Sequence, residues 1–132
     1  MAAIAVVLDQ TTAGALYEPG GPFTEAVAAF YVQASGGLGR LYAPVLSLAE
    51  GDAAHPGLLA YVDGLRFVEV ESFGTAAALA AVELRRAGYS WAAAHAIHAA
   101  LPSVSHPEGR FLLTLTPDAY AGTGVRAVHP GQ

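Results

Sequence analysis

Apolar residues occur along the chain in short runs that alternate with stretches of helical spacing. The run from Ala3 to Leu8 is continuous and includes three β-branched residues, which is typical of a strand covered on both faces in a parallel sheet. The alternating residues Leu65 to Val70 indicate a strand at an exposed edge of the sheet. Further strands are predicted at Leu41 to Ala43, Phe111 to Leu115 and Val125 to Val128.

Between these strands, apolar residues three or four positions apart predict helices. The clearest helix covers Phe23 to Ala34, with Pro22 suited to its first turn and Gly36 to its end. Other helices are predicted at residues 11–16, 45–50, 56–62, 75–87, 91–101 and 117–121. Strands that alternate with helices predict a three-layer α/β/α sandwich with a central, mainly parallel sheet, because each crossover between parallel strands needs a helix.

Some helix ends carry signals of their own. Gly51 weakens the helix that begins at residue 45, because glycine is a poor helix former. Ser72 or Thr75 can cap the helix that ends at Ala87, and Ser90 can cap the helix that follows.

The composition is that of one folded domain. The chain has 132 residues, of which 54% are hydrophobic and 13% charged, and its mean hydropathy is +0.42. We expect a single domain at residues 1–128 and a C-terminal tail at residues 129–132. No run reaches the roughly 20 apolar residues of a membrane span, and no basic leader precedes the first strand. We therefore expect a soluble, cytoplasmic protein without a membrane anchor.

Charge and cysteine content narrow the functional classes. The chain lacks cysteine, which excludes disulfides and thiolate metal sites. Its net charge is −5, and the six basic residues are all arginine and are scattered along the sequence. The linear sequence shows no basic strip for a phosphate backbone, which weighs against avid nucleic-acid binding by the isolated chain.

Two acids stand where a site in a parallel sheet is expected. Asp9 follows the first strand and Glu50 ends the apolar run of residues 43–49, and binding sites in such sheets gather at the carboxyl ends of the strands. Carboxylates there can hold a hard divalent cation. The alternatives are that Asp9 caps a helix and that Glu50 is a solvated helix end.

Several segments, in order, resemble the PIN-domain family, which includes VapC-type toxins. Val6 to Thr11 resembles the opening strand of the family, with an aspartate and a hydroxyl residue two positions later. Tyr42 to Glu50 resembles the segment that carries its second acid on a helix. His95 to Ala100 resembles the Asp-Ala-x-His-x-Ala helix, and Leu113 to Pro117 resembles the last Thr-x-Asp segment.

The resemblance implies a PIN-like fold, a Mg²⁺- or Mn²⁺-dependent ribonuclease ancestry, and a site built from Asp9, Glu50, His95 and Thr116. Asp9 and Glu50 would be the metal ligands. His95 and Thr116 stand at the positions of the third and fourth acids. VapC-type relatives commonly form dimers and bind antitoxin segments, so the resemblance also implies a homodimer, an antitoxin-like protein partner and RNA as a possible partner.

The two substitutions remove negative charge from the implied site. One unit charge about 4 Å from a divalent ion contributes roughly 8 kcal/mol gross at an effective dielectric constant near 20, much of it offset by desolvation. A neutral histidine and a threonine supply no such charge. We therefore expect a degenerate nuclease centre in a protein that acts by binding a protein or nucleic-acid partner. The alternative is a Mg²⁺- or Mn²⁺-dependent endoribonuclease of VapC type.

Three further features have competing explanations. His95 and His98 lie at i and i+3 and could form part of a zinc site, but no third ligand is placed by the sequence. Asp118 could replace the missing acid at Thr116, although it also suits the first turn of a helix. The glycines from Gly36 to Gly39 follow a helix rather than a strand, so they predict a loop and not a phosphate-binding motif.

Overall fold

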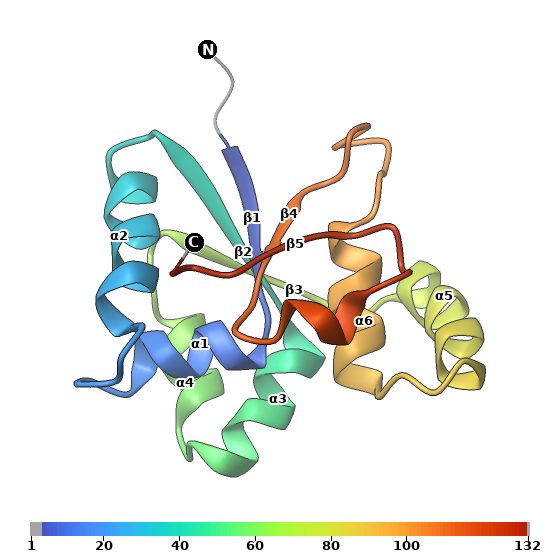
Figure 1. Cartoon of the computed structure of the whole chain (residues 1–132), viewed down its shortest axis with the longest axis horizontal. Helices are drawn as coiled ribbons and strands as arrows, with labels where there is room; N and C mark the ends of the chain where they lie inside the picture. The colour runs from blue at the N-terminus through green and yellow to red at the C-terminus, as the bar shows by residue number, and fades with distance from the viewer. Residues whose placement is uncertain (1–3, 132) are drawn as a thin grey trace.

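The centre of the fold is a sheet of five parallel strands in the spatial order β3-β2-β1-β4-β5 (Figure 1). The computed structural model describes residues 4–131. The strands are β1 Ile4–Leu8, β2 Gly39–Pro44, β3 Val68–Glu71, β4 Phe111–Leu113 and β5 Arg126–Val128. The predicted α/β/α sandwich with a parallel sheet is confirmed. Ala3 of the predicted first strand and Gln132 of the predicted tail lie outside the described residues.

Helices cover both faces of this sheet (Figure 1). They are α1 Gln10–Tyr17, α2 Thr24–Ser35, α3 Val45–Ala54, α4 Leu58–Asp63, α5 Thr75–Arg86, α6 Trp91–Ala100 and the 3-10 turn η1 Pro117–Tyr120. Helices α1, α2 and α4 contact one side of the sheet, and α6 contacts β1, β2 and β4 from the other, with α5 packed outside α6.

The alternation of side chains in the strands creates two separate cores. Val6 and Leu8 of β1 face the core shared with α1, α2, α3 and α4. Val7, between them, faces the core shared with α6. Neighbouring residues of a strand point to opposite faces, and helices cover both faces of β1. The continuous apolar run of this strand is explained by its position at the centre of the sheet.

One predicted strand boundary and one predicted helix cap are wrong near the exposed edge of the sheet. Strand β3 begins at Val68 rather than at residue 65, because Arg66 and Phe67 form a turn before the pairing of Leu41 with Val68. Helix α5 begins at Thr75 after Gly74, and no side chain caps it. The predicted cap by Ser72 or Thr75 is therefore wrong, whereas Ser90 caps α6 by accepting from the Ala93 N–H as predicted.

Helix α3 continues through Gly51, where the sequence predicts a weakened helix. A Cβ atom at residue 51 would lie 2.7 Å from Leu58 Cδ2 and 3.3 Å from Gln10 Cβ. The missing side chain lets α3 approach α1 and α4 closely. Packing thus favours glycine here, although it lowers the helix propensity.

The end of the described chain packs back onto the start of α2. The ring of His129 lies edge-on to that of Phe23, with 4.6 Å between the centroids. None of the helices within residues 4–131 has both the length and the apolar content needed to cross a bilayer.

Candidate functional site at the carboxyl end of the sheet

Asp9 lies at the carboxyl end of the central strand and is completely buried. It is the N-cap of α1, and its Oδ1 accepts hydrogen bonds from Thr11 N at 2.9 Å, Thr11 Oγ1 at 2.6 Å and Thr12 N at 3.2 Å. A buried carboxylate needs such donors, because water cannot reach it. The capping role, one of the two alternatives for Asp9, is confirmed, and the backbone and side-chain donors of α1 occupy Oδ1.

The second oxygen of Asp9 is occupied by Tyr120. The Tyr120 hydroxyl donates to Asp9 Oδ2 at 2.8 Å across 111 residues of sequence. Burial raises the pKa of this hydroxyl, and the charge of Asp9, the hydrogen bond to it and the charge of Glu50 raise the pKa further. Tyr120 therefore stays protonated and acts as a donor. The sequence carries a weak signal for it, because Tyr120 is the one aromatic residue of the short turn after Thr116.

A chain of threonine hydroxyls continues from Asp9 to the surface. The Thr11 Oγ1 proton is used on Asp9, so Thr114 Oγ1 is the donor across the 3.3 Å that separate these two hydroxyls. Thr114 Oγ1 lies 3.4 Å from Thr116 Oγ1 and accepts from the Thr116 N–H at 3.1 Å. Thr116, at the position of the expected fourth acid, is the exposed end of this neutral hydrogen-bond chain.

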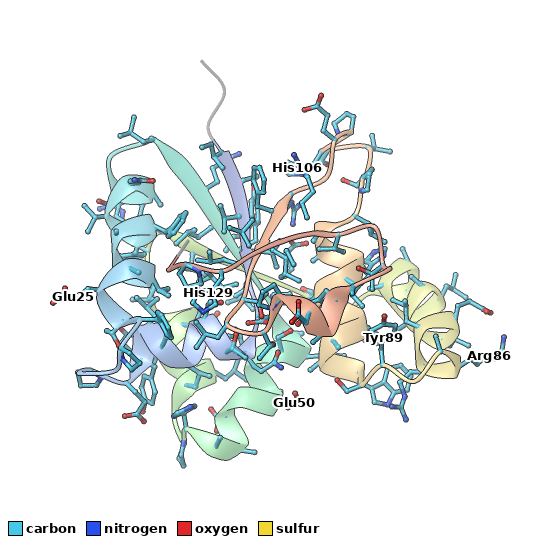
Figure 2. The ribbon with its side chains drawn as sticks, viewed as in Figure 1. Glu25, Glu50, Arg86, Tyr89, His106 and His129 are labelled. Atoms are coloured by element: carbon cyan, nitrogen blue, oxygen red, sulfur yellow. The ribbon has the colours of Figure 1, made fainter. Side chains whose placement is uncertain are left out.

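Glu50 lies on the exposed surface of α3 (Figure 2). Its charge reaches the site, because it contributes to the raised pKa of Tyr120. Asp118 is exposed on η1, and its backbone carbonyl accepts a hydrogen bond from the Ala121 N–H. Asp9 is therefore the one buried carboxylate of this site among the described residues, and Glu50 and Asp118 remain in solvent.

His95 is buried and holds α3 against α6. Its Nδ1 accepts a hydrogen bond from the Leu46 N–H at 3.3 Å. This amide lies in the first turn of α3, where the N-cap residue Pro44 provides no side-chain cap. Burial lowers the pKa of His95 to about 4, opposed by a hydrogen bond to the backbone of Ser72. The ring is neutral at pH 7, and a neutral ring can accept the Leu46 N–H at Nδ1.

A second bond between the same helices supports this arrangement. Ser47 is completely buried and donates its hydroxyl to the Ala92 carbonyl at 3.0 Å. The histidine at the position of the expected third acid therefore belongs to a polar contact between two helices.

The residues present do not suit a hard divalent cation. Mg²⁺ requires near-octahedral coordination by oxygens, usually with one or two carboxylates. Both Asp9 oxygens accept hydrogen bonds from protein donors, and the side chain of Thr116 is neutral. Within residues 4–131, no three His, Asp or Glu side chains gather in a way that could hold a metal ion, which also leaves His95 and His98 without a third zinc ligand.

Comparisons of the sequence with models of known protein families and with the curated proteins found no significant match.

Proposed function

We propose that this chain is a PIN-like protein with a degenerate nuclease centre, which acts by binding a partner rather than by hydrolysis. The observation that carries the proposal is the occupation of both Asp9 oxygens by Thr11, Thr12 and Tyr120. To coordinate a metal, a carboxylate oxygen must give up these hydrogen bonds and bind the ion instead. Here the donors belong to the folded chain, and their loss would break the start of α1 and the anchoring of η1.

A protein partner suits the chain better than RNA. The net charge of −5 repels a phosphate backbone at long range. Large apolar side chains are exposed instead on the outer helix α5 and at the start of α6, where Leu79 is 69%, Trp91 47% and Val82 41% exposed. An antitoxin-like protein or a second copy of the chain are the partners that the PIN-like resemblance implies.

The rival function is a Mg²⁺- or Mn²⁺-dependent endoribonuclease of VapC type. It requires Tyr120 to leave Asp9 Oδ2, and Glu50 to turn from solvent toward the same ion. The buried position of Asp9 at the carboxyl end of β1 is the feature that favours this alternative.

Thermal unfolding with and without Mn²⁺ or Mg²⁺ distinguishes the two functions. Binding at 100 times the dissociation constant adds about 2.7 kcal/mol to the free energy of unfolding. We expect no shift of the melting temperature for the wild-type chain and no cleavage of a labelled RNA. A shift that Asp9→Asn abolishes and Glu25→Gln retains would overturn the proposal, because Glu25 is an exposed acid on α2, outside the site.

Tyr120→Phe tests the role assigned to the tyrosine. The change leaves Asp9 Oδ2 buried without a donor, which should lower the free energy of unfolding by about 1–3 kcal/mol in urea titrations. Tyr61→Phe removes the hydroxyl of an exposed tyrosine and should change stability by less than about 0.5 kcal/mol. Equal effects of the two changes would show that the Tyr120 bond to Asp9 does not stabilise the site.

A further inference from the structure

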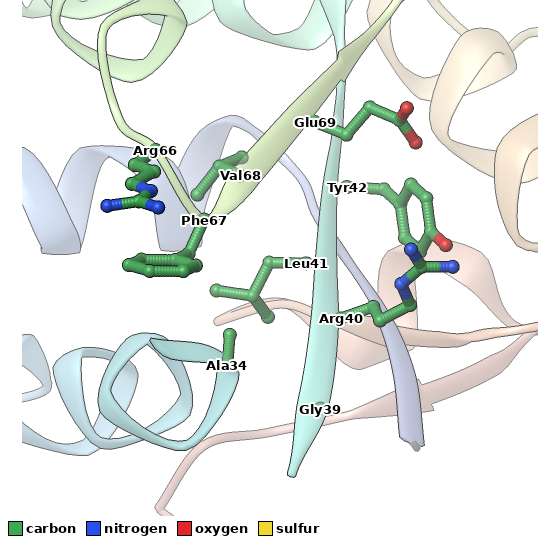
Figure 3. A pocket seen from close by; sticks show the side chains of 9 residues that line it. All are labelled: Ala34, Gly39, Arg40, Leu41, Tyr42, Arg66, Phe67, Val68 and Glu69. Atoms are coloured by element: carbon green, nitrogen blue, oxygen red, sulfur yellow. The ribbon is translucent and has the colours of Figure 1, made fainter. Parts of the chain in front are cut away.

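A groove lies at the amino end of β2 and β3, away from Asp9 (Figure 3). Its volume is about 410 Å³. The groove exists because the pairing of β2 with β3 begins at Leu41 and Val68, so that Gly39 and Arg40 extend beyond the edge strand. The turn before β3 then leads away from β2 and leaves this part of the strand without a neighbour on that side.

Two arginines line the groove from opposite faces of the sheet. Arg40 lies on the same side of β2 as Tyr42, and Arg66 lies on the side of Leu41, next to Phe67 (Figure 3). The Arg66 guanidinium carbon is 5.4 Å from the centroid of the Phe67 ring. Both arginine side chains are exposed.

Neither arginine has a carboxylate partner within residues 4–131. Two other arginines of these described residues do have partners: Arg110 pairs with Glu71 and Arg86 pairs with Glu83. Arg110 is buried over the Tyr42 ring. Because Glu71 pairs with Arg110, it is not the partner of Arg40 or Arg66. Arg40 and Arg66 thus offer two guanidinium groups to a ligand, although the chain as a whole carries a charge of −5.

We propose that this groove binds an extended acidic segment of a partner protein, with two adjacent acidic residues. Neighbouring side chains of an extended segment point to opposite sides, so two consecutive acids can reach Arg40 on one face and Arg66 on the other. Guanidinium groups bind carboxylates through paired hydrogen bonds. The half-buried ring of Phe67 supplies an apolar surface against which a flanking residue of the segment packs.

Glu69 explains why the ligand is a short acidic segment and not a nucleic acid. It lines the groove on the side of Arg40, opposite Tyr42 in the register of β2 and β3. A carboxylate in this position repels a continuous row of phosphates, whereas two localised acids can bind the arginines and avoid it. The inference does not depend on the degenerate state of the Asp9 site, which lies at the other end of the sheet.

The test is a titration of the ¹⁵N-labelled chain with the peptide acetyl-Val-Glu-Glu-Val-amide, followed by amide chemical shifts. We expect the Gly39, Arg40 and Phe67 amides to move, and the same peptide with two glutamines to leave them in place. Arg40→Gln and Arg66→Gln should each weaken binding about two- to five-fold, the range of exposed ion pairs. Arg86→Gln makes the same charge change on α5 and should have no effect.

A second pair of variants tests Glu69. General attraction between charges predicts only that the loss of an acid tightens binding, and it does not predict a difference between Glu69 and Glu83. Glu69→Gln should tighten peptide binding about two- to five-fold, and Glu83→Gln, the matched loss of an acid on α5, should not. Absence of shifts at the groove, or equal effects of the groove variants and their controls, would overturn the proposal. Tighter binding of oligouridylate or inorganic phosphate than of the peptide at the same amides would also overturn it.

Discussion

The buried carboxylate of Asp9 at the carboxyl end of the sheet is hydrogen-bonded by the protein itself. Asp9 was predicted as a site residue from its position after the first strand, and its alternative as a helix cap is confirmed. The bond from Tyr120 to Asp9 was not predicted, because these residues are 111 positions apart and no local pattern relates them. The spacing of apolar residues does not predict the role of His95 either, because its hydrogen-bond partners belong to α3 and to the segment before α5.

His95→Gln tests the neutral histidine through the pH dependence of stability. The folded-state pKa of about 4 lies below the ordinary value of 6.5, so the unfolded chain binds the proton first as the pH falls. Stability attributed to this group is complete above pH 6.5 and is lost between pH 6.5 and about 4. The difference between these two pKa values corresponds to about 3 kcal/mol in the free energy of unfolding. We expect the glutamine variant, measured by urea unfolding, to lose this part of the pH dependence.

His98→Gln is the matched control for this measurement. His98 is half-buried on the same helix, one turn from His95. We expect the control variant to keep the decline of stability between pH 6.5 and 4. An unchanged pH dependence in the His95 variant would contradict the assignment of His95 as a neutral buried acceptor.

At the scale of elements, local patterns predicted the order of strands and helices, and tertiary packing set several boundaries. The helix predicted to weaken at Gly51 continues to Ala54. The buried side chain of Leu58 fills the space that a residue-51 side chain would need. Strand β3 is shorter than the alternating pattern indicates, because its pairing with β2 begins at Val68. Propensity cannot report such contacts between elements.

Gly51→Ala should destabilise the chain, although alanine is the better helix former. Alanine improves helix propensity by about 1 kcal/mol, but its Cβ would lie 2.7 Å from Leu58 Cδ2, and Leu58 is completely buried. Overpacking of this kind costs about 1–3 kcal/mol. We therefore expect a net loss of about 1 kcal/mol in the free energy of unfolding, measured in urea.

A double variant separates this clash from other effects. Leu58→Ala shortens the side chain that alanine at residue 51 would meet, so the two changes together should cost less than the sum of the single changes. Additive costs would show that the contact between residues 51 and 58 does not determine the preference for glycine.

At the scale of the whole molecule, the fold gathers charges that are scattered in the sequence. Because all strands are parallel, residues near their first positions lie at the same end of the sheet. Four of the six arginines stand there, namely Arg40, Arg66, Arg110 and Arg126. The sequence pattern showed no basic strip, and the concentration of arginines at one end follows only from the topology.

The exposed apolar face of α5 is the basis of a prediction on assembly. Leu79 and Val82 lie about one helical turn apart and are 69% and 41% exposed. We expect a homodimer that buries this face and a molecular mass that rises with concentration in sedimentation equilibrium. Leu79→Lys should weaken the dimer at least about ten-fold, because it would place a charge in an apolar interface.

Val32→Lys is the control, since Val32 is 66% exposed on α2, on the other side of the sheet. It should leave the association unchanged. A strictly monomeric mass at high concentration would contradict the dimer, and an equal effect of both lysine variants would place the interface elsewhere.

The sequence by itself determined the layers of this protein. Apolar runs and helical spacing are local properties, and they decide which segments become strands buried on both faces and which become helices that cover them. Asp9 at the end of the first strand was also predictable, because a parallel sheet directs the carboxyl ends of its strands to one edge.

Tertiary structure alone decided what occupies that edge. The partners of Asp9 and His95 come from segments distant in the sequence, and whether a buried oxygen is free or satisfied depends on those partners. The groove between Arg40 and Arg66 likewise arises from the relative lengths of β2 and β3. Hydrogen-bond satisfaction and strand overlap are properties of the assembled fold, because both depend on distances between residues that the linear pattern does not relate.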